Sequence, residues 1–334
     1  MVLLRSKCSR VLYVFGSVFY IVERGRFSID SKNFTDQIKQ EQHQLTFLIC
    51  HVGALGDFIL TWPALLGLKR HFHHVRLVGL GRPEYMNLAG RFGIIDHGFD
   101  MESREMHDFF QGITMPEKLG QPAGALLWLK DAKKQADLIS PYAEFPVIMI
   151  DPFTSNGLHI SRYYCLLIQR YLNIKYPDDI TDLFPARILK GQRESLALIH
   201  PGSGSRQKNF SPAFYQGLKS ILIYHGFKKI MFILGPAENT LLSKYFSAED
   251  IIQPVTVLEL SEWLARSSFY IGNDSGVSHL AGFLGVPAFI FYRTTDPAIW
   301  GVLGKKVYHI KSDDEMIARQ LFKDYFIHSD LTGK

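Results

Sequence analysis

The sequence is poor in cysteine, and its N-terminal apolar run is too short to cross a membrane. Three cysteines, Cys8, Cys50 and Cys165, lie far apart among 334 residues. This odd number excludes a disulfide scaffold and indicates a reducing compartment, so we expect a cytoplasmic protein. The apolar run covers residues 11–22, whereas a membrane-spanning helix needs about 18 to 25 apolar residues.

Motifs that mark several enzyme classes are also missing. Gly79-Leu80-Gly81 continues as Arg82-Pro83-Glu84, so the G-x-G-x-x-G dinucleotide fingerprint fails. The lack of a G-x-S-x-G elbow weakens a hydrolase interpretation. No two aspartates are spaced as D-x-D, which leaves the pattern of metal-dependent single-domain glycosyltransferases without support. We therefore expect no metal site.

The charge balance is mildly basic and uneven. Lysine and arginine number 37 against 32 aspartates and glutamates, a net charge of +5, and residues 1–30 hold five basic and two acidic side chains. That segment supplies +3 of the total. The rest of the chain shows no basic stripe, so we expect no nucleic-acid partner.

Residues 1–44 form an N-terminal extension. Its apolar run, 11–22, starts after Arg10 and is followed by Glu23 and Arg24. The next residues lack a small-x-small cleavage site, which argues against secretion. The pattern predicts either a hydrophobic helix packed on the protein or a basic-flanked helix on an anionic membrane surface. The sequence leaves both open.

The remaining chain reads as two successive α/β domains, 45–185 and 186–334. A hydrophobic content of 47% indicates a globular protein, and this length predicts two domains. Apolar residues on consecutive positions predict strands buried on both faces. Between them, 211–225 has the clearest helical pattern, with Ser211 as the cap and Gly226 at the stop. The predicted strands are 45–52, 75–80, 146–150, 196–200, 229–234, 269–272 and 287–292.

Three motifs follow predicted strands, where ligands bind in doubly wound sheets. In the first, Gly53-Ala54-Leu55-Gly56-Asp57, glycines permit a tight turn or a close approach to a ligand. Asp57 either serves the site or merely caps the next helix. Because Pro63 would fall inside that helix, we expect a kink there or a later start with Thr61 as the cap.

The second motif is the segment 200–208, His-Pro-Gly-Ser-Gly-Ser-Arg-Gln-Lys. Its small and hydroxylated residues offer backbone N–H and side-chain O–H donors, and Arg206 and Lys208 add positive charge. This combination suits a diphosphate. The glycine spacing is not that of a Walker loop. The alternative is a flexible surface loop.

The third motif is the segment 272–281, Gly-Asn-Asp-Ser-Gly-Val-Ser-His-Leu-Ala. A glycine-rich turn that opens a helix forms an anion site. Asp274 would repel a phosphate, so we expect it to brace the turn or cap the helix. Ser275 and His279 are four residues apart and share a helix face. His279 is either part of the site or a structural histidine.

Together, the motifs resemble the ADP-heptose:lipopolysaccharide heptosyltransferases of glycosyltransferase family 9, which have the GT-B fold. The likeness lies in GALGDFILTWPALLGLKR, HPGSGSRQKNFSP, ILGPAE and IGNDSGVSHLAGFLGVPAFIFYRTTDPAIW, over roughly residues 45–310. It implies two Rossmann-like doubly wound domains facing a cleft. It also implies an inverting transfer of a sugar, with heptose as the family default, from a nucleotide-sugar donor such as ADP-heptose to a lipid-linked lipopolysaccharide core acceptor.

The resemblance also implies roles for individual residues. Asp57 would be the general base, and Lys208 would neutralise the leaving diphosphate as the second catalytic residue. No cofactor is required, although a solvent magnesium ion on the donor diphosphate is compatible with this scheme. The remaining donor-binding residues would be Gly56, Ser203, Gly204, Ser205, Glu238 on the ribose, Asp274, Ser275, Gly276 and His279.

The sequence departs from the family pattern in three places. Residues 1–44 precede the usual first strand, Phe210 replaces a common tryptophan, and Arg293-Thr294 replaces a common Gly-Pro pair. The last change leaves the donor sugar open. The alternatives are a GT-B transferase for another nucleotide sugar and glycan, or a nucleotide-sugar-binding protein without catalysis. The presence of both Asp57 and Lys208 favours an active enzyme, located in the cytoplasm or peripherally on the inner membrane.

Overall fold

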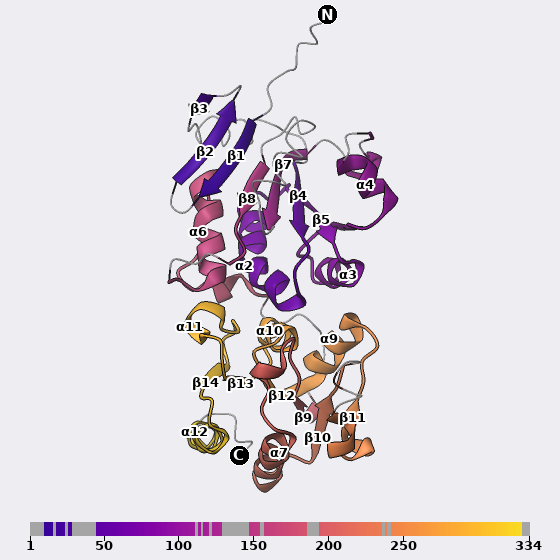
Figure 1. The fold of residues 1–334 in the computed structure, drawn as a ribbon, viewed down its shortest axis with the longest axis vertical. Coiled ribbons are helices and arrows are strands. Elements are labelled where there is room, and N and C mark those ends of the chain that lie inside the picture. The colour runs from indigo at the N-terminus through magenta and orange to yellow at the C-terminus, as the bar shows by residue number, and fades with distance from the viewer. Residues whose placement is uncertain are drawn as a thin grey trace, which may run out of the picture. The chain divides into compact units, whose positions relative to one another are not determined.

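A computed structural model of the chain contains two compact units (Figure 1). Unit 1 comprises Met1–Gly53, Thr61–Asn156 and Ile160–Ile180, and unit 2 comprises Ala54–Leu60, Gly157–His159 and Thr181–Lys334. The structure describes residues 10–15, 18–23, 26–28, 45–110, 113–114, 116–119, 122–128, 147–153, 157–185, 194–235, 238 and 242–328.

Unit 1 is built on an eight-stranded sheet in the order β3-β2-β1-β8-β7-β4-β5-β6. The strands from β1 to β6 in this order are mutually parallel. They repeat the Rossmann order 3-2-1-4-5-6 when β4 is counted first and β1 last. The bounds are β4 Thr46–His51, β5 Arg76–Gly81, β6 His97–Asp100, β7 Pro122–Trp128 and β8 Val147–Ile150, with α3 Pro83–Arg91, α4 Arg104–Phe110, η1 Glu117–Leu119 and α6 Ile160–Leu172. Two elements include residues of both units, α2 Leu55–His71 and η2 Ile180–Leu183.

The N-terminal apolar run forms strands, so the predicted helix over residues 11–22 is wrong. Strand β1 (Arg10–Phe15) pairs with β8 in parallel and with β2 (Val18–Glu23) in antiparallel register, and β2 continues to β3 (Arg26–Ser28). The run is two segments rich in valine, tyrosine and phenylalanine, separated by Gly16-Ser17. That is a hairpin pattern, and these residue types favour strands. The membrane-interface helix is therefore absent from residues 10–15 and 18–23.

Helix α2 passes through Pro63 without a break in its assignment. It begins at Leu55, so the predicted later start with Thr61 as the cap is wrong. The side chains of Phe58, Trp62 and Leu65 are fully buried, and such packing outweighs the low helix propensity of proline. None of the described helices is both long enough and apolar enough to span a bilayer.

Unit 2 contains a six-stranded, fully parallel sheet in the order β11-β10-β9-β12-β13-β14. Counted from β9, this is again the order 3-2-1-4-5-6, and the strand order reverses between β9 and β12. The bounds are β9 Glu194–His200, β10 Lys229–Ile233, β11 Ile251–Ile252, β12 Ser267–Asn273, β13 Ala288–Tyr292 and β14 Val307–Lys311, with η3 Arg206–Lys208, α7 Pro212–Tyr224, η4 Ser243–Tyr245, η5 Ala248–Asp250, α9 Val257–Arg266, α10 Gly276–Phe283, α11 Pro297–Trp300 and α12 Glu315–His328.

The seven predicted strands are confirmed as β4, β5, β8, β9, β10, β12 and β13. The predicted helix after Ser211 is also confirmed, because the Ser211 side chain accepts a hydrogen bond from the Phe214 backbone at 3.2 Å. The Glu315 carboxylate accepts from the backbone N–H and the hydroxyl of Ser211, at 2.6 and 2.7 Å. The start of α12 thereby fixes the start of α7.

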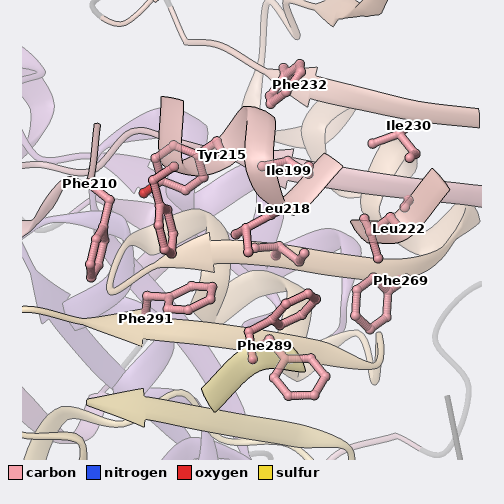
Figure 2. Packing of buried hydrophobic residues seen from close by; sticks show 14 of the residues in the cluster. Ile199, Phe210, Tyr215, Leu218, Leu222, Ile230, Phe232, Phe269, Phe289 and Phe291 are labelled. Atoms are coloured by element: carbon pink, nitrogen blue, oxygen red, sulfur yellow. The ribbon is translucent and has the colours of Figure 1, made fainter. Parts of the chain in front are cut away.

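The core of unit 2 is rich in aromatic side chains (Figure 2). Phe322 and Phe326 of α12 stack on each other with ring centroids 5.4 Å apart. Phe289 of β13 meets the Phe322 ring edge to face at 5.1 Å. Such ring pairs add about 0.5 to 1.5 kcal/mol beyond the area that they bury. These ring contacts join α12 to the sheet of unit 2.

Candidate functional site

The candidate site lies at the carboxyl ends of the parallel strands of unit 2. The second and third sequence motifs follow β9 and β12, the neighbouring strands at which the strand order reverses. Ligands bind at this position in Rossmann-type sheets. The sheet order therefore brings together two loops that are about seventy residues apart in the sequence.

Buried Asn273, at the end of β12, connects the two loops. It is 0% exposed, and its Nδ2 donates to the Pro201 carbonyl at 2.9 Å. The same group lies 3.2 Å from Asn209 Oδ1. The Tyr215 hydroxyl donates to Asn273 Oδ1 at 2.5 Å. A buried amide whose groups are paired in this way fixes the loop rigidly.

Within the loop after β9, the Ser203 hydroxyl makes internal hydrogen bonds. It lies 2.6 Å from Asn209 Oδ1 and 2.7 Å from the Ser205 carbonyl oxygen. The Ser205 backbone N–H lies 3.3 Å from the same hydroxyl. Ser203 thus braces the loop. A Cβ at Gly204 would meet nothing within 4 Å, so Gly204 leaves the loop surface open.

Asp274 is the centre of a charged cluster. Lys208 Nζ and Thr295 Oγ1 both donate to Asp274 Oδ2 at 2.6 Å, and His279 Nε2 faces Oδ1 at 3.6 Å. The Asp274 side chain is 6% exposed, whereas that of Lys208 is 30% exposed. Burial alone would raise the Asp274 pKa, but His279, together with hydrogen bonds from Lys208 and Thr295, outweighs it and holds the pKa well below its usual range.

Ser275 caps helix α10, and its hydroxyl accepts from the Ser278 backbone at 3.3 Å. Ser278 Oγ also lies 2.9 Å from the Tyr270 hydroxyl and donates to the Asn273 carbonyl. Behind the cap, Ser275 Oγ lies 3.4 Å from His200 Nδ1. Burial lowers the pKa of His200 to about 4. This histidine is therefore neutral near pH 7 and adds no positive charge beside the start of α10.

The start of α2 belongs to unit 2 and lies directly against the start of α10. A Cβ at Gly276 would lie 2.9 Å from Leu55 Cβ and 3.0 Å from the Gly56 nitrogen. A Cβ at Gly56 would lie 3.1 Å from His279 Cδ2. Only glycines permit this approach. It places Asp57, in the first turn of α2, beside the charged cluster.

The environment of Asp57 favours its neutral form. Burial raises the Asp57 pKa, although charges on His279 and Lys208 and a hydrogen bond from the Ala54 backbone oppose the shift. The negative charge of Asp274 acts in the same direction as burial. A carboxylate with a raised pKa is a stronger base when ionised, as a general base requires.

Glu238 lies beside the loop after β9. A Cβ at Gly202 would lie 2.4 Å from Glu238 Cγ, and a Cβ at Gly235 would lie 2.6 Å from Glu238 Oε2. The Glu238 side chain thus packs against Gly202 and Gly235, which follow β9 and β10. All the residues named for the site from the sequence lie in unit 2.

The sequence motifs assign no role to Asn273 or Thr295, although both lie in a segment that carries the family resemblance. Asn273 precedes Asp274 directly, and an amide at a strand end before a glycine-rich turn is the signal that could have identified it. Thr295 had no such signal, because its contact with Asp274 depends on the pairing of β12 with β13. Among the residues that the structure describes, no three His, Cys, Asp or Glu side chains are grouped to hold a metal ion.

One fully parallel and one largely parallel sheet, each with covering helices, define this chain as an α/β protein with the fold of the GT-B glycosyltransferases. The solved structures that share that fold include the following three. The E. coli heptosyltransferase WaaC with ADP has a TM-score of 0.67 at 15% identity, over 85% of this chain and 99% of that one. The E. coli ADP-heptose lps heptosyltransferase II has 0.64 at 15%, over 86% and 98%. A family 9 glycosyltransferase from Veillonella parvula has 0.63 at 16%, over 86% and 90%.

Residues 167–324 match the family model described as glycosyltransferase family 9 (heptosyltransferase). No curated protein matches the sequence. The matched residues contain Lys208, Glu238, Asp274 and His279, whereas Gly56 and Asp57 lie outside them. This match covers a little under half of the chain, agrees with the resemblance of the sequence motifs and supports a glycosyltransferase, and the predicted GT-B fold class is confirmed.

Proposed function

We propose that the chain transfers heptose from ADP-heptose to a lipopolysaccharide core acceptor with inversion at the anomeric carbon. The family match supports sugar transfer, and the names of two structural relatives, the heptosyltransferase WaaC with ADP and ADP-heptose lps heptosyltransferase II, support this donor and acceptor class. The observation that carries the proposal is the environment of Asp57 within unit 2. A half-buried carboxylate, Asp57, lies beside a lysine and a helix start.

On the donor side, Lys208 and the start of α10 would neutralise the diphosphate. The helix start supplies backbone N–H groups at Gly276, and Ser275 fixes its direction. Ser205 and Gly204 would present the loop to the phosphates, while Ser203 holds its shape. Since Asp274 already binds Lys208 at 2.6 Å, a diphosphate would share or replace that partner.

Glu238 would accept hydrogen bonds from the donor ribose. Its carboxylate lies against Gly202 and Gly235, next to the phosphate loop, which is where a ribose attached to that diphosphate would lie. Asp274 and His279 would order the sugar end of the donor through the Lys208 and Thr295 contacts.

On the acceptor side, Asp57 would take the proton of the attacking hydroxyl. The acceptor oxygen bonds to the anomeric carbon, the bond from that carbon to the diphosphate oxygen breaks, and ADP leaves with the electron pair. A positioned carboxylate base contributes about 10²- to 10⁴-fold to the rate. Preorganised N–H groups and Lys208 stabilise the charge that develops on ADP. The scheme needs no protein-bound cofactor, and a magnesium ion from solvent is compatible with the donor diphosphate.

A second candidate is transfer of another nucleotide sugar to a different glycan. It is favoured by Arg293-Thr294, which replaces the family's usual Gly-Pro pair before Thr295. Thr295 contacts Asp274, so a change in this loop adjoins the proposed donor site. A scaffold role without catalysis is the third reading. For all three, we propose a cytoplasmic or membrane-peripheral location.

The test compares Asp57→Asn with wild type for transfer and for donor binding. We expect unchanged ADP binding and a fall in kcat of about 10²- to 10⁴-fold. Asp182→Asn is the matched control, because Asp182 forms an exposed ion pair with Lys305 in the same unit. Full turnover in Asp57→Asn would exclude the base assignment. A thermal-shift screen of nucleotide sugars identifies the donor, since a ligand of the folded state raises the apparent stability.

A further inference from the structure

The loop after β13, residues 293–295, is linked to the segment that carries Lys208 in two ways, indirectly through Asp274 and directly through Arg293. One contact is the hydrogen bond from Thr295 to Asp274, which in turn binds Lys208. The other comes from Arg293, whose Nη1 donates to the Asn209 carbonyl at 2.7 Å. The Arg293 guanidinium also lies over the Phe210 ring, 5.2 Å from its centroid.

These contacts restrain the chain on the C-terminal side of Lys208. Asn209 follows Lys208 directly, and its side chain is held by Ser203 and by buried Asn273. Its carbonyl is held by Arg293. Phe210 is itself anchored, because it stacks on Phe214 with ring centroids 4.5 Å apart. Arg293 therefore contacts both the anchored Phe210 ring and the Asn209 carbonyl, which is next to Lys208 in the chain.

Arg293 is itself held in place through its backbone. Lys311 Nζ, at the end of β14, donates to the Arg293 carbonyl at 2.9 Å and to the Thr295 carbonyl at 3.0 Å. The loop is thus tied to the sheet on one side and to the Lys208 segment on the other. A guanidinium that both hydrogen-bonds and lies on a ring loses less freedom than a flexible ammonium would.

We propose that Arg293 is a positioning residue that holds the segment 206–210, so that Lys208 meets the donor diphosphate in a fixed geometry. The proposal rests on the proposed function, since it takes Lys208 as the diphosphate ligand. Arg293 acts through the Asn209 carbonyl and the Phe210 ring, not by contact with the reacting atoms. Replacing it with methionine keeps an extended side chain and removes both interactions.

The experiment measures the affinity of ADP and of adenosine for wild type, Arg293→Met, Lys208→Met and the double variant by calorimetry. We expect Arg293→Met to weaken ADP by about 10-fold, the loss of one hydrogen bond from a charged donor, and to leave adenosine unchanged. In the Lys208→Met background, Arg293→Met should cost nothing further. Such non-additivity is the sign of action through Lys208.

Arg266→Met is the matched control, because the Arg266 guanidinium also lies over a ring, that of Trp263 at 5.4 Å, on helix α9. It should leave ADP affinity unchanged. Wild-type ADP affinity in Arg293→Met, an equal loss for adenosine, or full additivity with Lys208→Met would each overturn the positioning role. If Lys208→Met itself binds ADP like wild type, the diphosphate site of the proposed function fails instead.

Discussion

The contact between Gly56 and Gly276 allows a sharp test of how the site is assembled. In Gly276→Ala, the new Cβ would lie 2.9 Å from Leu55 Cβ and 3.0 Å from the Gly56 nitrogen. Real Cβ atoms essentially never show the first distance, and the second is tighter than nine in ten real Cβ contacts. The starts of α2 and α10 must therefore separate, and Asp57 moves with α2.

The size of the effect follows from this displacement. A shift approaching 1 Å of a catalytic group costs about 10²-fold in rate, or about 2.7 kcal/mol in activation free energy. Overpacking of the contact costs about 1 to 3 kcal/mol of stability. We expect kcat to fall by about 10²-fold and the melting temperature to drop, while the protein remains folded.

The assay is steady-state sugar transfer together with thermal unfolding. Gly90→Ala is the control, because a Cβ at Gly90 in α3 would meet nothing within 4 Å, and alanine favours a helix. It should keep full activity and gain slightly in stability. A Gly276→Ala enzyme with wild-type kcat would refute the argument that this contact sets the position of Asp57.

Four further predictions concern pH, the N-terminal strands and the core. Because the folded-state pKa of Asp274 is depressed, the ionised carboxylate adds to the free energy of unfolding above about pH 4, and this contribution is lost as the pH falls. In chemical denaturation at a series of pH values, Asp274→Asn should therefore lose less stability at acid pH than wild type does. Because burial raises the Asp57 pKa, the acid limb of kcat should lie above the pH of about 3.9 expected for an exposed aspartate, and a limb at or below that pH would contradict the burial argument. Deleting residues 1–28 should uncover the edge of β8 and promote aggregation on heating, whereas an unchanged melting curve would show that β1 adds nothing. Phe326→Ala should cost about 3 to 5 kcal/mol in urea unfolding, and Tyr325→Ala, which is exposed on the same helix, should cost much less.

Pro63 and the N-terminal run show where local patterns fail. The sequence around Pro63 argues for a helix break, yet α2 continues because buried side chains on both sides of the proline pack into the protein. The hydrophobicity of the run over 11–22 predicts a helix. Its strands depend on β8, a partner more than a hundred residues away, which periodicity within the run cannot reveal.

Local sequence patterns specify the features that depend on neighbouring residues. Consecutive apolar residues specified most of the buried strands, and Ser211 marked the start of α7 because a cap acts within one helical turn. The three loop motifs were identifiable for the same reason, since glycine, serine and lysine give a loop its chemistry wherever it lies.

Tertiary structure alone decided which of these pieces meet. The order of strands in unit 2 places the loop after β9 beside the loop after β12, and the β12–β13 pairing brings Thr295 to Asp274. The glycine contact adds Asp57 to the same cluster. Strand order and helix contacts arise from packing between residues far apart in the chain, and no short stretch of sequence encodes them.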